Sequence, residues 1–193
     1  MTGAGGPTSP GPDLLPSEKI IALRDAFEHN AIPYAFGGAI ALFYYREPRS
    51  TLDIDINVFL PPARHAEVVN VLADLYPVDR TQVANDVASA GQARSAWDMT
   101  DIDLFFADTD FHDVMARRVR REPFLGSMIN VLSAEDLLVC KMLFDRPKDW
   151  VDVDAVVNAL GDRLDRSYVD GALALFVEPT DARFARWRTT PPP

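Results

Sequence analysis

The segment Leu52–Leu60 (LDIDINVFL) constrains the fold of this chain most, because polar and apolar residues alternate along it. Successive side chains of a β-strand point to opposite faces of a sheet. One face of the segment therefore carries Asp53, Asp55 and Asn57, and the other carries apolar side chains. The pattern predicts a strand that is buried on its apolar face and presents carboxylates on the opposite face.

The rest of the sequence predicts a mixed α/β fold, with the strand inside an α/β body and helices after it. Apolar residues at helical spacing predict helices over residues 17–30, 39–45, 63–75, 111–119, 137–144, 149–160 and 167–176. Further strands are expected at residues 32–36 and 101–107, with a hairpin over residues 124–132. Residues 78–98 leave room for one strand and a polar loop around Gly91.

The body is expected to span residues 17–132 and the helical lobe residues 133–188, because the apolar period becomes helical from Ser133 onward. Ser17, Asp149 and the pair Ser133 and Asp136 are the predicted helix caps. Residues 1–16 and 189–193 are rich in residues that bury little apolar surface, chiefly proline, so both predict disordered tails.

Composition narrows the class of protein. Hydrophobic residues make up 48% of the 193 residues, yet no apolar run approaches the length of about 18–20 residues that crosses a bilayer. The N-terminus lacks the pattern of a secretory signal, so we expect a cytoplasmic protein with no membrane partner. Cys140 is the single cysteine, which excludes an intrachain disulfide and a cysteine zinc cluster.

The two aspartates of the alternating strand predict a metal site. Asp53 and Asp55 leave the same face, and like charges so close are unfavourable unless a cation lies between them. Magnesium prefers carboxylate oxygens, and it also binds substrate phosphates. Asp103 on the second aspartate-bearing strand is the natural third ligand, with Asp101 as the alternative. The simpler interpretation is that these residues are the solvent-facing side of a half-exposed strand.

Residues close to this strand suit a phosphate. Gly37 and Gly38 end one predicted strand and open a helix, where glycine lets the backbone approach a phosphate. Arg49 could neutralise phosphate charge, and Thr51 lies on the same strand face as the aspartates. Each feature also has a simpler interpretation, as a turn, a surface arginine and a β-forming threonine.

In this order, the motifs resemble those of a known superfamily. The four segments of this chain that carry the resemblance are Gly37–Leu42 (GGAIAL), Arg49–Ile56 (RSTLDIDI), Ile102–Asp108 (IDLFFAD) and Ser133–Asp152 (SAEDLLVCKMLFDRPKDWVD). They resemble the nucleotidyltransferases that share the polymerase-β-like core, and in particular the AbiEii/AbiGii-like toxin branch with the related MenT toxins. The likeness spans residues 32–160, and the spacing from Gly-Gly to the aspartates favours the toxin branch over antibiotic-modifying relatives.

The resemblance implies a role for each matched residue. Asp53, Asp55 and Asp103 match the carboxylates that hold two Mg²⁺ ions, and Gly37 and Gly38 match the phosphate-cradling turn. Lys141 matches a lysine that contacts the nucleoside triphosphate. The remaining matched positions, expected to bind nucleotide, are Arg49, Thr51, Lys148 and Asp152.

The function that the resemblance implies is transfer of a nucleotide from a nucleoside triphosphate to the 3′ end of transfer RNA. Such toxins block translation and are usually paired with a cognate antitoxin protein. The net charge of −10 argues against a whole-surface nucleic-acid binder, but two arginine groups could form a local patch. These are Arg117, Arg118, Arg120 and Arg121, and Arg183, Arg186 and Arg188.

Two alternatives remain open from the sequence. A small-molecule nucleotidyltransferase of the antibiotic-modifying type would use the same carboxylates with an acidic acceptor pocket. A non-catalytic relative would bind nucleotide without transferring it, although the presence of all three carboxylates argues against this.

Overall fold

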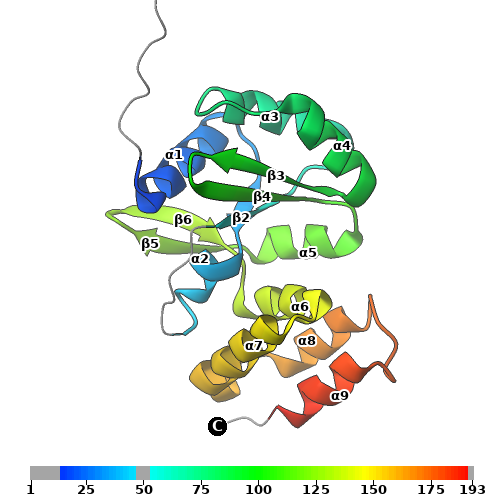
Figure 1. Ribbon diagram of the computed structural model, residues 1–193. Coiled ribbons are helices and arrows are strands. Elements are labelled where there is room, and N and C mark those ends of the chain that lie inside the picture. Colours follow the sequence, from blue (N-terminus) through cyan, green and yellow to red (C-terminus); the bar gives the residue numbers. More distant parts are fainter. Residues whose placement is uncertain (1–13, 47–52, 191–193) are drawn as a thin grey trace, which may run out of the picture.

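The computed structural model describes residues 14–46 and 53–190, and within them a single mixed sheet forms the centre of the molecule (Figure 1). Its strands are β1 (Tyr34–Phe36), β2 (Ile54–Val58), β3 (Gln92–Trp97), β4 (Thr100–Phe106), β5 (Arg120–Phe124) and β6 (Ser127–Val131). Their order across the sheet is β3-β4-β2-β1-β6-β5. The fold class is therefore mixed α/β, as the sequence predicted.

Two parallel pairs lie inside the sheet, and antiparallel pairs surround them. β2 runs parallel to β4, and β1 runs parallel to β6, whereas β1–β2, β3–β4 and β5–β6 are antiparallel. In the β2–β4 pair, Asp55 is the register partner of Asp103. Two segments that are far apart in the sequence thus present carboxylates at the same level of the sheet.

Helices lie on both sides of this sheet. They are α1 (Pro16–His29), α2 (Gly38–Leu42), α3 (His65–Ala73), α4 (Arg80–Ala90), α5 (Asp110–Arg118), α6 (Ala134–Phe144), α7 (Pro147–Leu160), α8 (Arg166–Leu173) and α9 (Ala182–Thr189). Short 3₁₀ turns occupy Pro62–Arg64 and Gly161–Arg163. Figure 1 shows α1, α3 and α4 above the sheet and the lobe of α6–α9 below it. None of these helices combines the length and apolarity needed to span a bilayer.

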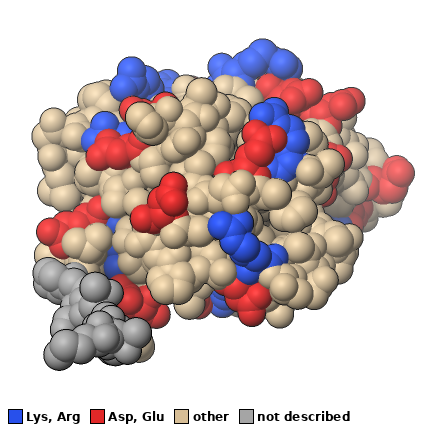
Figure 2. Space-filling view, turned by 90° about the horizontal axis from the view of Figure 1, so that it is seen from above, with Lys and Arg blue, Asp and Glu red and all other residues tan. Residues whose placement is uncertain are grey.

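The face above the sheet carries charges of both signs. Figure 2 shows acidic and basic side chains interspersed over it, without a continuous basic surface. A polyanion would meet repulsion as well as attraction there, so this face is a poor candidate for nucleic-acid binding.

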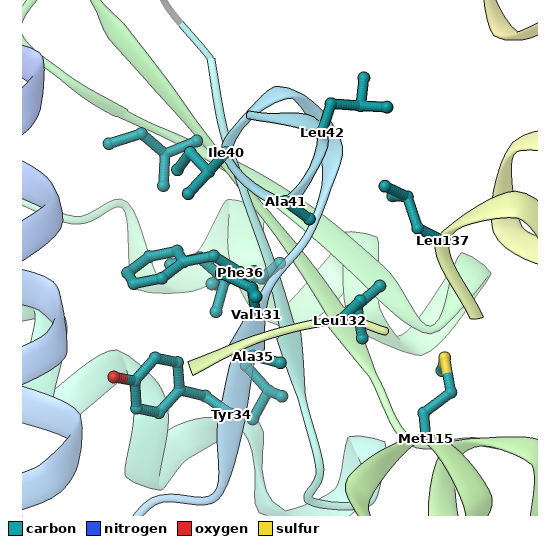
Figure 3. Close-up of a cluster of buried hydrophobic side chains, with 14 of the residues drawn as sticks. Tyr34, Ala35, Phe36, Ile40, Ala41, Leu42, Met115, Val131, Leu132 and Leu137 are labelled. Atoms are coloured by element: carbon teal, nitrogen blue, oxygen red, sulfur yellow. The ribbon is translucent and has the colours of Figure 1, made fainter. Parts of the chain in front are cut away.

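The core beside the first glycine turn fixes where that turn lies. Phe36 at the end of β1 is fully buried, and Ile40 and Leu42 from α2 pack in the same cluster (Figure 3). Leu132, directly after β6, and Leu137 of α6 approach the cluster from the other side in the same view. Because apolar contacts hold both flanks, the turn between β1 and α2 has a fixed position against the sheet.

The structure resolves the stretch that the sequence left ambiguous. Residues 78–98 hold a helix and a strand: the Asp79 side chain accepts hydrogen bonds from the backbone N–H groups of Thr81 and Gln82, which starts α4. Gly91 ends α4 with φ +66°, and β3 follows directly. The predicted polar loop around Gly91 is therefore a single turn, because the glycine adopts a left-handed conformation.

Two predicted caps are wrong, and one is confirmed. The first helix begins at Pro16 and not after Ser17, because proline suits the first helical position and Glu18 accepts the Leu15 N–H at 2.7 Å. α7 likewise begins at Pro147, so Asp149 lies inside its first turn. Ser133 caps α6 as predicted, since its Oγ accepts the Asp136 N–H at 3.2 Å.

Residues 189 and 190, which were predicted to belong to a disordered tail, are ordered, and residues 191–193 lie outside the described residues. α9, which the sequence did not predict as a helix, ends at Thr189, and Thr190 is buried with its Oγ hydroxyl donating to Asp154 at 3.3 Å. Trp187 explains this order, since its buried ring anchors α9 and its Nε1 donates to Asp170 at 2.6 Å.

We expect Phe36→Ala to lower the free energy of unfolding by about 3–5 kcal/mol, because it removes a fully buried ring and leaves a cavity. Urea unfolding followed by circular dichroism measures the change. Met99→Ala is the control, since this side chain is 84% exposed and its loss should change stability by less than about 0.5 kcal/mol. Equal effects of the two substitutions would contradict the assigned core.

Candidate active site

The three predicted carboxylates lie along one cleft. Asp55 is in β2, Asp53 directly precedes this strand, and Asp103 is in β4. Ile54 and Ile102 alternate with them and are buried on the opposite face. The apolar alternation therefore fixes which face the carboxylates take, and the register between β2 and β4 fixes their common level.

The Gly37-Gly38 turn touches the central carboxylate directly. The Gly37 N–H donates to the backbone oxygen of Asp55 at 2.8 Å. Gly38 has φ +47°, and a Cβ atom on it would lie 1.7 Å from Oδ2 of Asp55. Glycine is thus required at position 38 both for its conformation and for the approach of the carboxylate. The sequence suggested only a phosphate contact for this turn.

A cleft of about 320 Å³ separates the sheet from the helical lobe. Besides the carboxylates and Gly38, its lining includes cationic side chains from α6, from α7 and from the residue before it, namely Lys141, Lys148 and Arg146. Phe105 of β4 and Phe144 of α6 form an apolar part of the wall, with ring centroids 5.9 Å apart. Acidic and basic groups thus face each other across a pocket of small-molecule size.

Lys141 is buried and is held by carboxylates of the next helix. Its Nζ lies 2.7 Å from Oδ2 of Asp152 and 3.5 Å from Oδ1 of Asp149. Asp152 also accepts a hydrogen bond from Arg46 at 2.6 Å, and Asp149 accepts one from Arg146 at 2.6 Å. The lysine therefore has a fixed direction, and the buried Asp152 lies behind it, outside the lining of the cleft.

Arg94 is a site residue that the sequence reasoning missed. It lies on β3 opposite Asp103, and its Nε and Nη2 donate to the two Asp103 oxygens at 2.7 and 2.8 Å. Its Nη1 reaches Asp101 at 3.1 Å. The alternation of Gln92–Trp97 (QARSAW) was the available signal, but the partner strand follows only from the fold.

The pKa of Asp55 is raised to about 6, first by burial and then by the negative charges of Asp103 and Asp53. Lys141 and Arg146 oppose this shift without cancelling it. Within the described residues, no side chain donates a hydrogen bond to the Asp55 carboxylate. The central carboxylate is thus short of positive charge, although cations surround it.

The donor set fits a hard divalent cation. Asp53, Asp55 and Asp103 offer carboxylate oxygens, and Gly38 has no side chain where the Asp55 carboxylate lies. Among the described residues, no side chain donates a hydrogen bond to Asp55. In the described ranges, no three carboxylate, histidine or cysteine side chains are already gathered as a metal-binding group. Both oxygens of Asp103 are instead directed to Arg94.

Two predicted site residues, Arg49 and Thr51, lie outside the described residues. Their roles as nucleotide contacts stay predictions.

No protein-family model and no curated protein matches this chain. Two solved structures of the antibiotic-resistance factor ANT(2'')-Ia are similar in fold. The solution structure aligns over 83% of this chain and 90% of that one, at 14% identity and a TM-score of 0.55. The crystal structure with adenylyl-2''-tobramycin aligns over 83% and 95%, at 15% identity and a TM-score of 0.55.

A nucleotidyltransferase-like protein from Paracoccidioides brasiliensis aligns over 90% of this chain and 92% of that one, at 12% identity and a TM-score of 0.49, a likeness too weak to argue from. The stronger likeness shows that the chain has the nucleotidyltransferase fold, which confirms the broader part of the sequence expectation. It does not show that the chain belongs to the toxin branch.

Gly38→Ala should destabilise the protein by at least about 2 kcal/mol, because the new methyl group meets Asp55 and the backbone is left-handed. Thermal unfolding measures the loss. Gly171→Ala is the matched control: a Cβ atom there meets open space in α8, where alanine favours the helix by up to about 1 kcal/mol. A Gly38→Ala protein as stable as the wild type would contradict the close approach of Asp55.

Asp55→Asn should raise the free energy of unfolding of metal-free protein by about 1–3 kcal/mol at neutral pH. The folded-state pKa of Asp55 lies above its unfolded value, so ionisation weakens the fold as the pH rises from about 4 through about 6. Urea unfolding with EDTA at several pH values measures the effect, beside the exposed control Asp162→Asn. Below pH about 4 the aspartate is protonated in both states, so the stability gain of Asp55→Asn should vanish there. A stability gain of the same size below that pH would contradict the electrostatic cause.

Proposed function

We propose that this chain is a magnesium-dependent nucleotidyltransferase. The observation that carries the proposal is the juxtaposition of Asp53, Asp55 and Asp103 with the Gly38 turn, across a cleft from Lys141. The negative charges of Asp103 and Asp53 help to raise the pKa of Asp55, so a cation between these carboxylates would be stabilising. The basic groups across the cleft suit a polyphosphate. The nucleotidyltransferase fold agrees with this chemistry.

The reaction would be attack of an acceptor hydroxyl on the α-phosphorus of a nucleoside triphosphate. The new phosphorus–oxygen bond forms as the bond to the bridging α–β oxygen breaks, pyrophosphate leaves, and the hydroxyl proton passes to solvent. Mg²⁺ held by Asp53, Asp55 and Asp103 would stabilise the charge of the triphosphate and lower the pKa of the acceptor hydroxyl. Two ions are proposed, as in the resemblance.

The chain's own residues would bind and orient the triphosphate. Gly38 lets the backbone approach its phosphates, while Lys141 and Lys148 offset their charge from the helical lobe. Asp152 keeps the Lys141 ammonium in place through the contact of 2.7 Å, so its proposed nucleotide role is indirect. Phe105 and Phe144 provide an apolar wall suited to a base.

The acceptor we propose is the 3′ end of transfer RNA, following the resemblance to the toxin branch. In-line displacement places the acceptor and the leaving group on opposite sides of the phosphorus, so two clefts must meet at the carboxylates. A second cleft of about 350 Å³ shares Asp55 and Asp103 with the first and extends toward α4. Its charged lining combines Arg94 and Arg146 with Asp55, Asp103 and Asp86, so the transfer-RNA acceptor rests on the resemblance and not on the charge of this cleft.

Several arginines of the two groups already contact other side chains, so they are less available to bind transfer RNA. Arg118 pairs with Glu135 at 3.0 Å, and Arg183 pairs with Asp181 at 2.7 Å. Arg186 is exposed but stacks over Trp150, with its guanidinium carbon 4.4 Å from the ring centroid. A transfer-RNA contact would therefore rest on exposed members such as Arg117 and Arg121, at one end of α5 and along the edge strand β5. The toxin role, the cognate antitoxin and a cytoplasmic location complete the proposal.

A small-molecule acceptor is the second candidate. The fold likeness to ANT(2'')-Ia, whose crystal structure holds adenylylated tobramycin, favours it. The two candidates predict different labelled products from the same chemistry.

The test incubates the full chain with Mg²⁺, each α-labelled nucleoside triphosphate, total RNA and an aminoglycoside mixture. Label on transfer RNA supports the first candidate, and label on a small molecule supports the second. Asp53→Asn and Asp103→Asn should each reduce incorporation at least about a hundredfold, because phosphoryl transfer depends on charge stabilisation. Asp162→Asn should leave it unchanged. Absence of label from every acceptor, with the triphosphate intact, would contradict transferase activity.

A further inference from the structure

The ion pair between Arg94 and Asp103 engages both oxygens of the third carboxylate. The two residues are register partners on β3 and β4, so the backbone itself brings them together. One guanidinium binds both oxygens of Asp103, at 2.7 and 2.8 Å, and its remaining nitrogen reaches Asp101. A planar fork of this kind matches a carboxylate in two bonds, which makes it the strongest geometry for such a pair.

Asp55 and Asp103 differ in their surroundings. Asp55 has no hydrogen-bond donor among the described side chains, whereas Asp103 has two from a single residue. The side chain of Asp103 is 17% exposed and that of Arg94 is 60% exposed, so the arginine covers the carboxylate from the solvent side. Any divalent cation that uses an Asp103 oxygen therefore competes with Arg94 for that oxygen.

We propose that Arg94 is a positioning residue that competes with the divalent cation for Asp103 and thereby weakens cation binding to the protein. This inference rests on the proposed function, because it assumes that Asp103 is a metal ligand. Arg94 also lines both clefts, so once it is displaced from Asp103 its guanidinium remains beside the space in which phosphates would lie.

The charge of Arg94 and its two-bond geometry make separable contributions. Removal of any nearby positive charge would raise cation affinity through simple electrostatics. Lysine keeps the charge but has no planar fork to bind both oxygens of Asp103. Competition for the oxygens therefore predicts tighter cation binding in Arg94→Lys as well as in Arg94→Met.

The experiment is titration of the full chain with Mn²⁺ alone, with free Mn²⁺ followed by electron paramagnetic resonance. The proteins are the wild type, Arg94→Met, Arg94→Lys, Arg146→Met, Asp103→Asn and the double variant Arg94→Met with Asp103→Asn. Arg146→Met controls for charge, because Arg146 lines the same clefts but pairs with Asp149. Thermal unfolding verifies that each variant is folded.

We expect Arg94→Met to lower the Kd for Mn²⁺ roughly two- to fivefold, in line with an ion pair whose arginine is largely exposed. Arg94→Lys should lower it by a smaller factor, and the Arg94 substitution should have no effect once Asp103 is asparagine. A purely structural role for Arg94 would weaken Mn²⁺ binding when the residue is replaced, which is the opposite sign.

Several results would overturn the inference. One is that both Arg94 variants bind Mn²⁺ no more tightly than the wild type. Another is that Arg94→Met still changes the Kd for Mn²⁺ when Asp103 is replaced by asparagine. Equal tightening by Arg146→Met, with Arg94→Lys unchanged, would assign the effect to net charge. If none of the proteins binds Mn²⁺ saturably, the proposed function itself is overturned. This outcome is distinct from one in which Mn²⁺ binds but the Arg94 substitutions do not tighten its binding.

Discussion

The parallel pairing of β2 with β4 is the contact on which the rest of the site depends. It brings Asp55 level with Asp103 across 48 positions of sequence, and it leaves both carboxylates on the face turned toward the helical lobe. The buried isoleucines between them hold this orientation, because a shift of one residue would move carboxylates into the core. The Gly38 turn, the Lys141 cluster and Arg94 are then arranged around a fixed line of negative charge.

This arrangement places mutually repelling carboxylates at the site where the chemistry is proposed, which is unfavourable for folding. Asp55 is partly buried beside like charges, and no side chain of the described residues donates a hydrogen bond to its carboxylate. Lys141, Arg94 and Arg146 each contact another carboxylate. A group that is unfavourable for folding is expected where binding of a ligand repays the cost.

Local patterns allowed much of the fold to be predicted. Alternation identified β2 and β4, and the capping serine identified α6, because both are determined by neighbours within a few residues. The prediction failed for α4 and α9, which have few apolar residues. Their positions depend on an aspartate cap for α4 and on two buried aromatic side chains, Phe184 and Trp187, for α9. Arg94 was missed for a related reason, since its strand lacked a recognisable start.

The sequence by itself determined the chemistry of the site: which residues are carboxylates, which face they share along one strand, and where glycine permits close approach. Only the tertiary structure decided how these parts combine. Strand register aligned Asp55 with Asp103, β3 set Arg94 against that carboxylate, and α7 fixed Lys141 through Asp152. Side-chain direction along a strand or helix follows from the local backbone, whereas pairing between distant segments follows from the packing of the whole core.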